Sequence, residues 1–406
     1  MRRCCNTSKR AILAILTWAT EPLAWGVPPS VMQTLSPLFR SLSLFAASAL
    51  LSSAAVSAQQ DAPAAKAVTP GLPTGYAGAP GEDPGRIIVL NKAAHTASVV
   101  DVANGEILAT LKTGVGPHEV AVHPEGRFAV VADYGEAQPG SSLTVLDLDE
   151  LKVVGSIDLG TPIRPHGLVF EDDGKHMWIS AETQRQVWQV SFPEGKVIRK
   201  IDSEASATHM VAWTPDGRIF TANIGSGSTS VIGPRADGSL GLLAQVPTGG
   251  GAEGVCVTPN GKHVWVSNRA DDSVSVIDAH SLKVVKELPC AGFPIRAEAS
   301  ADGRLVLVSS ATGGAVTVFD AVDHSQLARI PMPFAAGEEG DAVLGQMGES
   351  SIPIGITLHP SGKLAFVANA AVDKIAVIDL LRRKVVAQLP TGRGPDGVAW
   401  VPSRRR

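Results

Sequence analysis

Residues 253–268, EGVCVTPNGKHVWVSN, contain a turn, Pro259-Asn260-Gly261-Lys262, between two short apolar runs. Val255 to Val257 precede the turn, and His263 to Ser267 follow it. Pro, Asn and Gly favour tight turns, and β-branched residues on both sides favour strands. This stretch therefore predicts two short strands joined by a tight turn.

The same turn, followed by a basic residue, recurs along the chain with its Gly at positions 126, 174, 217, 261, 303 and 362. The successive intervals are 48, 43, 44, 42 and 59 residues. Most units add a third apolar run that ends in Asp, and a fourth run follows it. Four short strands repeated at a period of about 45 residues predict the four-stranded antiparallel blades of a β-propeller.

The two ends of the repeat region supply one more blade. Residues 394–402, GPDGVAWVP, match residues 116–124, GPHEVAVHP, but the repeat stops there. Residues 83–86, DPGR, begin where that match ends. The fold class predicted over residues 83–402 is therefore all-β, a seven-bladed β-propeller closed by pairing of N- and C-terminal strands, which leaves no exposed sheet edge at the closure.

Charge and composition narrow the classes of function. The 41 Gly and 28 Pro residues are spread along the chain and argue against a bundle of long helices. Five of the 35 basic residues and one of the 39 acidic residues lie in residues 1–58, so the remainder has a net charge of about −8. This acidic balance argues against nucleic acid as a main partner.

Residues 1–58 have the pattern of a secretory leader. From Met32 a short n-region leads into the apolar run SLSLFAASALLSSAAV and the small residues Val56-Ser57-Ala58. We therefore predict export to the periplasm or medium, with no stable membrane span after processing; the stretch before Met32 is either part of a longer leader or an over-extended start. Residues 59–82 are predicted to be a flexible Pro/Ala/Gly linker, and residues 332–352 an inserted loop.

Two cysteines remain after the leader. Cys256 falls on an inner strand and Cys290 just after an outer strand of the same blade. Three strand spacings place them about 14 Å apart, beyond the reach of a disulfide. We expect both to be free thiols.

The repeat units resemble those of the YVTN-repeat (YncE-like) seven-bladed propellers, a family of exported bacterial proteins. The resemblance is carried by units that end in Val266-Ser267-Asn268, Val367-Ala368-Asn369 and Val89-Leu90-Asn91, and it covers residues 83–402. It implies the propeller fold and export. It does not imply a particular reaction, because that family is defined by its repeat.

Candidate site residues appear eight positions before each turn Gly, where each inner strand begins at the mouth of the channel. These residues are His118, His166, His209, Glu253, Ile295 and Ile354, with Asp396 as the equivalent in the closing blade. Imidazoles and a carboxylate with an open position to solvent could hold a divalent metal, the ligands being His118, His166, His209 and Glu253. A pocket for a small polar ligand and a purely structural polar plug are the alternatives.

The sixth unit carries a charged pair in its inner strand. Glu298 stands where other units have Ala121, Ala212 or Cys256, and Arg296 precedes it by two residues. In a regular strand the two would share a face, so we expect a buried ion pair. The alternative is that Arg296 binds an anionic group of a ligand and Glu298 orients it.

Two further resemblances bear on function. The unit from Gly116 to Arg127 is similar to repeats of lactonase-type propellers, which implies His118, Glu253 and Arg296 as candidate residues for a hydrolase. The histidines also resemble those of the haem-bearing propeller of nitrite reductases, which has eight blades. We predict a monomeric exported propeller that binds a small polar ligand, a metal or a protein partner at its histidine-bearing mouth; a lactonase-like or metal-dependent hydrolase is the alternative.

Overall fold

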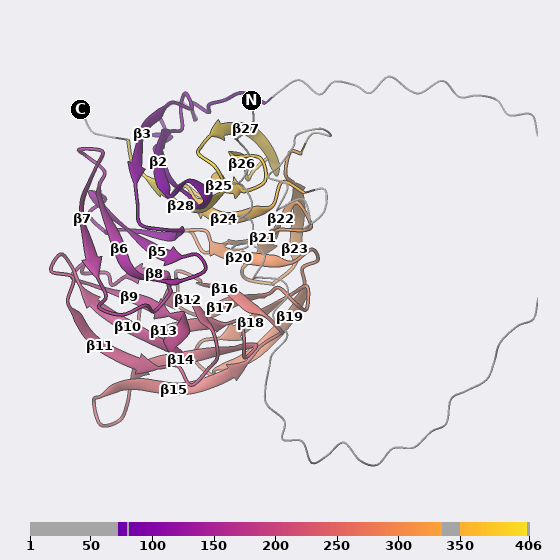
Figure 1. The fold of residues 1–406 in the computed structure, drawn as a ribbon. Coiled ribbons are helices and arrows are strands. Elements are labelled where there is room, and N and C mark those ends of the chain that lie inside the picture. Colours follow the sequence, from indigo (N-terminus) through magenta and orange to yellow (C-terminus); the bar gives the residue numbers. More distant parts are fainter. Residues whose placement is uncertain (1–71, 79–80, 335–349, 404–406) are drawn as a thin grey trace, which may run out of the picture. The chain divides into compact units, whose positions relative to one another are not determined.

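The computed structural model describes residues 72–78, 81–334 and 350–403. These residues form 28 strands in seven four-stranded antiparallel sheets, the blades of a propeller (Figure 1). Within this part of the chain the helices are two short 3-10 turns, η1 (Lys92–Ala94) and η2 (Glu182–Gln184). The predicted all-β, seven-bladed β-propeller is confirmed.

The innermost strands of the seven blades contact one another in succession around the ring. They are β4 (Pro117–Val122), β8 (Pro165–Phe170), β12 (Thr208–Trp213), β16 (Ala252–Val257), β20 (Pro294–Ala299), β24 (Pro353–Leu358) and β28 (Pro395–Val401).

The other strands follow outward in each blade. The second strands are β5 (Phe128–Gly135), β9 (His176–Ala181), β13 (Ile219–Asn223), β17 (His263–Asn268), β21 (Leu305–Ser310), β25 (Leu364–Asn369) and β1 (Arg86–Asn91). The third strands are β6 (Pro139–Asp147), β10 (Gln186–Ser191), β14 (Ser228–Pro234), β18 (Ser273–Asp278), β22 (Ala315–Asp320), β26 (Lys374–Asp379) and β2 (Thr96–Asp101). The outer strands are β7 (Lys152–Asp158), β11 (Val197–Asp202), β15 (Leu240–Pro247), β19 (Lys283–Pro289), β23 (Gln326–Pro331), β27 (Lys384–Pro390) and β3 (Ile107–Lys112).

The repeated turn joins each inner strand to the second strand of its blade. Its Gly has a positive φ in all six units, for example 67° at Gly261 and 82° at Gly217. Gly85, in the closing blade, has a φ of 75°. Residues with a side chain rarely adopt this conformation, which is why Gly recurs at this position and makes the period visible in the sequence.

The ring closes through pairing of β28 with β1. Arg86 pairs with Val401, Ile87 with Trp400 and Ile88 with Ala399 in an antiparallel register. The Arg86 guanidinium donates to the carbonyl of Leu148, in the neighbouring blade, at 2.8 Å. The closing blade therefore combines residues from both ends of the repeat region, as predicted.

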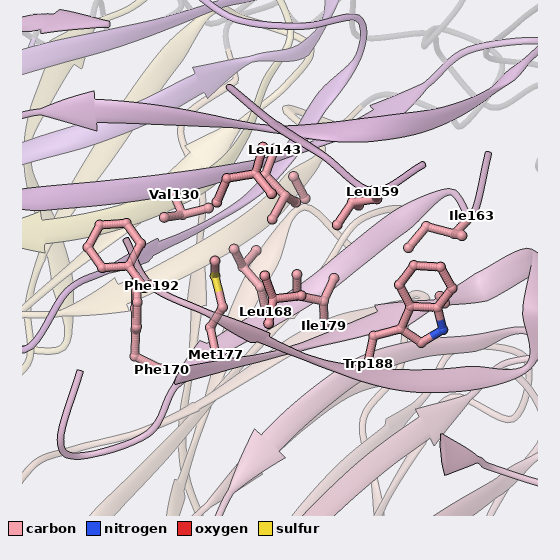
Figure 2. Packing of buried hydrophobic residues seen from close by; sticks show 14 residues of the cluster. Val130, Leu143, Leu159, Ile163, Leu168, Phe170, Met177, Ile179, Trp188 and Phe192 are labelled. Atoms are coloured by element: carbon pink, nitrogen blue, oxygen red, sulfur yellow. The ribbon is translucent and has the colours of Figure 1, made fainter. Parts of the chain in front are cut away.

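The hydrophobic core lies between neighbouring blades. In the cluster of Figure 2, Val130 and Leu143 come from the blade β4–β7, whereas Leu168, Met177 and Ile179 come from the blade β8–β11. Burial of an aliphatic side chain of this size contributes roughly 1.5–3 kcal/mol relative to its exposed state. Each blade is thus stabilised by its two neighbours.

The predicted leader, residues 1–58, lies outside the described residues, as do most of the linker and the centre of the inserted loop, which includes Glu338, Glu339, Asp341 and Glu349. Where the linker is described, the Tyr76 amide donates to Val102 and the Pro73 carbonyl accepts from Gln388. Cys256 and Cys290 are buried free thiols, as predicted. The described residues contain no helix with the length and apolar character needed to cross a membrane.

Candidate functional site

The predicted site residues occupy the second position of the seven inner strands. Five are polar, and each is at most 3% exposed: Asp396, His118, His166, His209 and Glu253, on β28, β4, β8, β12 and β16. The other two are Ile295 on β20 and Ile354 on β24. The fold thus brings the predicted polar residues to one end of the inner strands, but they are buried there rather than open to solvent.

The three imidazoles are stacked against one another. The ring centroids of His166 and His209 are 3.5 Å apart, and those of His118 and His166 are 4.1 Å apart. The Tyr134 ring meets His118 and His166 edge to face, at 4.9 and 5.2 Å between centroids. His166 is therefore enclosed by aromatic rings.

Carboxylates orient two of the three imidazoles. Nδ1 of His118 lies 3.2 Å from Oδ2 of Asp396. Nδ1 of His209 lies 2.7 Å from Oε2 of Glu182, which follows β9 in η2. A neutral imidazole that donates from Nδ1 keeps its lone pair on Nε2, so these carboxylates select the tautomer whose Nε2 can bind a metal.

Ion pairs surround the imidazoles. Arg296 Nη2 lies 2.5 Å from Oε1 of Glu119, and Arg296 Nη1 lies 3.4 Å from Oε1 of Glu253. Arg269 Nη1 contacts the other oxygen of Glu253 at 2.6 Å. Lys92 Nζ lies 3.4 Å from Oδ2 of Asp396. A cationic side chain thus lies beside each of these three carboxylates.

The prediction of an ion pair between Arg296 and Glu298 was wrong. Arg296 binds Glu119 and Glu253 instead, and among the described residues Glu298 has no hydrogen bond or ion pair. The reason is an irregularity in β20, whose register with β21 shifts between Pro294 and Ala297. A bulge interrupts the two-residue alternation of side chains, so residues two apart no longer share a face.

Burial determines the protonation of the histidines. Burial lowers the pKa of His118 to about 4, although Asp396 acts in the opposite direction. Burial also lowers the pKa of His166 well below its ordinary value, and His209 and His118 add to the effect. Both imidazoles are consequently neutral at pH 7.

The carboxyl groups respond differently. Burial raises the pKa of Glu253 but is outweighed by Arg269, His209 and Arg296, which hold it well below its usual range. Burial also raises the pKa of Asp396, but its interactions with His118 and Lys92 outweigh burial and lower it. Burial raises the pKa of Glu119 despite its pair with Arg296. Burial, with a contribution from Glu119, raises the pKa of Glu298 to about 7.

Two groups of side chains in the described residues have the spacing of a metal site; Glu171, Asp173 and His176 form one, and the other lies among the stacked imidazoles. His118, Glu119 and His166 each present a ligand atom, and these atoms lie within 4.8 Å of one another. Of the predicted metal ligands, this group includes His118 and His166, while Glu253 is engaged by two arginines. His209 lies beside the group through its contact with His166.

Glu119 was missed by reasoning from the sequence, as were Lys92, Arg269, Glu182 and Tyr134. A signal for Glu119 was present, because it is the third residue of its inner strand. At that position four inner strands have Gly, namely Gly167, Gly254, Gly355 and Gly397. A Cβ there would meet the backbone of the adjacent inner strand, so a larger residue at this position is a marked departure.

The inner strands are buried at their first residue, and most are partly exposed at their fifth. The first residue is buried in all seven. The fifth is partly exposed in five of them: Ala121, Val169, Glu298, Thr357 and Ala399. Solvent therefore reaches the inner strands beyond the histidines, on the side where Glu298 lies.

Comparison with known families bears on the fold. A family model described as YNCE-like beta-propeller matches residues 241–336, which include β16 to β23. These residues contain Glu253, Arg296 and Glu298 but none of the three clustered histidines.

A curated Pseudomonas aeruginosa protein named dihydro-heme d1 dehydrogenase is 22% identical over 327 residues, or 66% of this chain, and the chain spans 65% of that relative's length. Among solved structures, a functionally unknown protein from Desulfotomaculum acetoxidans is 16% identical and matches 79% of this chain and 100% of its own, with a TM-score of 0.65. A dihydro-heme d1 dehydrogenase in complex with DHE is 18% identical and matches 81% of this chain and 67% of its own, with a TM-score of 0.54. The structural likenesses show the shared fold.

Proposed function

We propose that this propeller binds a divalent transition-metal ion through His118, Glu119 and His166. The matched family model and the seven blades support membership of a YncE-like seven-bladed propeller family, which gives the fold but not the ligand. The observation that carries the proposal is the convergence of their ligand atoms within 4.8 Å. Two imidazoles and a carboxylate are a donor set used for zinc, copper and iron(II) in proteins.

His166 supports this proposal most directly. It is 0% exposed, and neither of its ring nitrogens has a hydrogen-bond partner in the described part of the chain. Leaving a buried polar group unsatisfied costs roughly 1–3 kcal/mol. A metal ion bound at one ring nitrogen would offset this cost.

The charges around the imidazoles also favour a cation over an anion. His118 and His166 are neutral at pH 7 and can donate lone pairs, which metal binding requires. Oδ2 of Asp396 lies 3.2 Å from Nδ1 of His118, and a carboxylate in this position is found behind many metal-binding histidines. The arginines near the site are already paired with carboxylates.

Calorimetric titration of metal-free protein with Zn²⁺, Cu²⁺ and Ca²⁺ tests the proposal. We expect one equivalent of Zn²⁺ or Cu²⁺ to bind, and little Ca²⁺, which prefers sites built from oxygen ligands. His166→Ala should weaken binding at least about 100-fold, because it removes a ligand. His123→Gln is the control, since His123 lies one residue beyond β4 and bonds the Gly174 carbonyl. Absence of stoichiometric binding for every ion would refute the proposal.

A tetrapyrrole is the second candidate ligand, because a curated relative and a similar solved structure both bear the name dihydro-heme d1 dehydrogenase. His166 would be a candidate ligand for its iron, and Lys92 and Arg296 candidate partners for its carboxylates. Titration with haem, followed by its absorbance, and with Zn²⁺, followed by calorimetry, separates the two candidates.

We also propose that the protein is exported and that its mature chain begins near Gln59. The proposal is based on the apolar run and the Val56-Ser57-Ala58 site in the sequence. N-terminal sequencing of the protein from its native host is the test. Retention of residues before Ser57 would contradict export by cleavage at this site.

A further inference from the structure

The inner strands of a propeller surround a central channel, and their exposure indicates from which side solvent approaches the proposed metal site. The first two positions of the inner strands are almost entirely buried, whereas the fifth is partly exposed in most of them. Within the site, the side chain of Glu119 is 14% exposed, against 2% for His118. Solvent therefore reaches the site from the side on which Glu119 lies.

Glu298 is the one charged residue in the partly exposed half of the described inner strands. The fourth to sixth positions of the seven inner strands carry no other charged residue; at the fifth position the counterparts of Glu298 are Ala121, Val169, Ala212, Cys256, Thr357 and Ala399. The carboxyl group of Glu298 has no hydrogen bond or ion pair among the described residues. It is close enough to Glu119 for the two carboxyl groups to interact electrostatically.

We infer that Glu298 is the entry carboxylate of the channel, which attracts a divalent cation from solvent and passes it to Glu119 and the histidines. The inference rests on the proposed metal site. A carboxylate in a channel with low-dielectric walls concentrates cations and raises their association rate. Since Glu298 is not among the three side chains that form the site, it should act on the rate of binding far more than on the final affinity.

Stopped-flow measurement of Co²⁺ binding to the metal-free protein tests this inference, with the visible absorbance of bound Co²⁺ as the signal. At low ionic strength, Glu298→Gln should lower the association rate constant about tenfold. The equilibrium dissociation constant should change by less than about threefold, and high salt should reduce the difference in rate. Asp172→Asn is the matched control, because it removes one exposed carboxylate from the turn that follows β8 and should leave the rate unchanged.

Each outcome decides the inference. Equal association rates for the wild type and Glu298→Gln would overturn it while leaving the proposed metal site intact. A large loss of equilibrium affinity in Glu298→Gln would also overturn it, since Glu298 would then be a ligand. If the wild type binds neither Co²⁺ nor Zn²⁺, the proposed function fails and the entry role fails with it.

Discussion

Blades β16–β19 and β20–β23 are neighbours with the same strand order, but their inner strands begin differently. The second residue is Glu253 in one and Ile295 in the other, and both are buried. Isoleucine at this position removes apolar surface from water, whereas a buried carboxylate must be compensated by Arg269 and Arg296. The fold therefore accepts an apolar residue at this position. The polar residues that five of the seven blades carry there are not required by the architecture.

Deletion of residues 395–406 should have the largest effect. It removes β28, which carries Asp396, and it also opens the ring. The edge of β1 and the face of β4 that β28 covers would be exposed. We expect the cooperative thermal transition, followed by circular dichroism, to be lost. A melting curve identical to that of the full-length protein would contradict the closure.

Acid should destabilise the metal-free protein, because the buried histidines of the site take up protons less readily in the folded state than in the unfolded state. His118 has a pKa of about 4 when folded and an ordinary value of 6.5 when unfolded, so the unfolded chain takes up its proton first as the pH falls. The free energy of unfolding should therefore decrease between about pH 6.5 and pH 4, by about 3 kcal/mol for His118. Urea denaturation across this pH range measures the decrease, and His118→Gln should diminish it. An unchanged pH dependence in that variant would show that His118 is not titrating.

Asp396→Asn changes the carboxylate behind His118 and should act on metal affinity. An amide does not favour one tautomer of His118 as a carboxylate does, so we expect affinity for Zn²⁺ to fall about 10- to 100-fold. Competition with a chromophoric chelator measures the change. Ile354→Val, at the equivalent position of an apolar blade, is the control and should bind Zn²⁺ as the wild type does.

Ile295→Val should have the smallest effect. Removal of one buried methylene from β20 should lower the free energy of unfolding by about 1 kcal/mol and leave metal affinity unchanged. Urea denaturation and the same chelator competition provide the two values. A clear loss of Zn²⁺ binding would show that a blade with isoleucine at this position also contributes to the metal site.

The fold could be predicted because its signal is local. The turn Gly needs a positive φ in every unit, and that requirement leaves a regular period in the sequence. The second position of each inner strand could be found from the same period. His118 and His166 were therefore identified without any knowledge of their neighbours in space.

The contacts within the site could not be predicted in the same way. Lys92, Glu182 and Arg269 come from segments outside the inner strands, and their partners are set by how the blades approach one another. The expected pair of Arg296 with Glu298 assumed a regular strand. A register shift near the start of β20, which recurs in all seven inner strands, interrupts that regularity, and Arg296 pairs with Glu119 instead.

The closure by β28 also has a consequence for folding kinetics. In the other blades, hydrogen-bonded strands are consecutive in the sequence, but the contact of Arg86 with Pro402 joins residues 316 positions apart. Contacts of such long range form slowly, because a large loop must close before they gain stability. We expect the other blades to form first and the ring to close last. Asp396 lies on β28, so His118 acquires its neighbouring carboxylate only in that final step. The amount of metal bound tightly would then report how many molecules have finished folding.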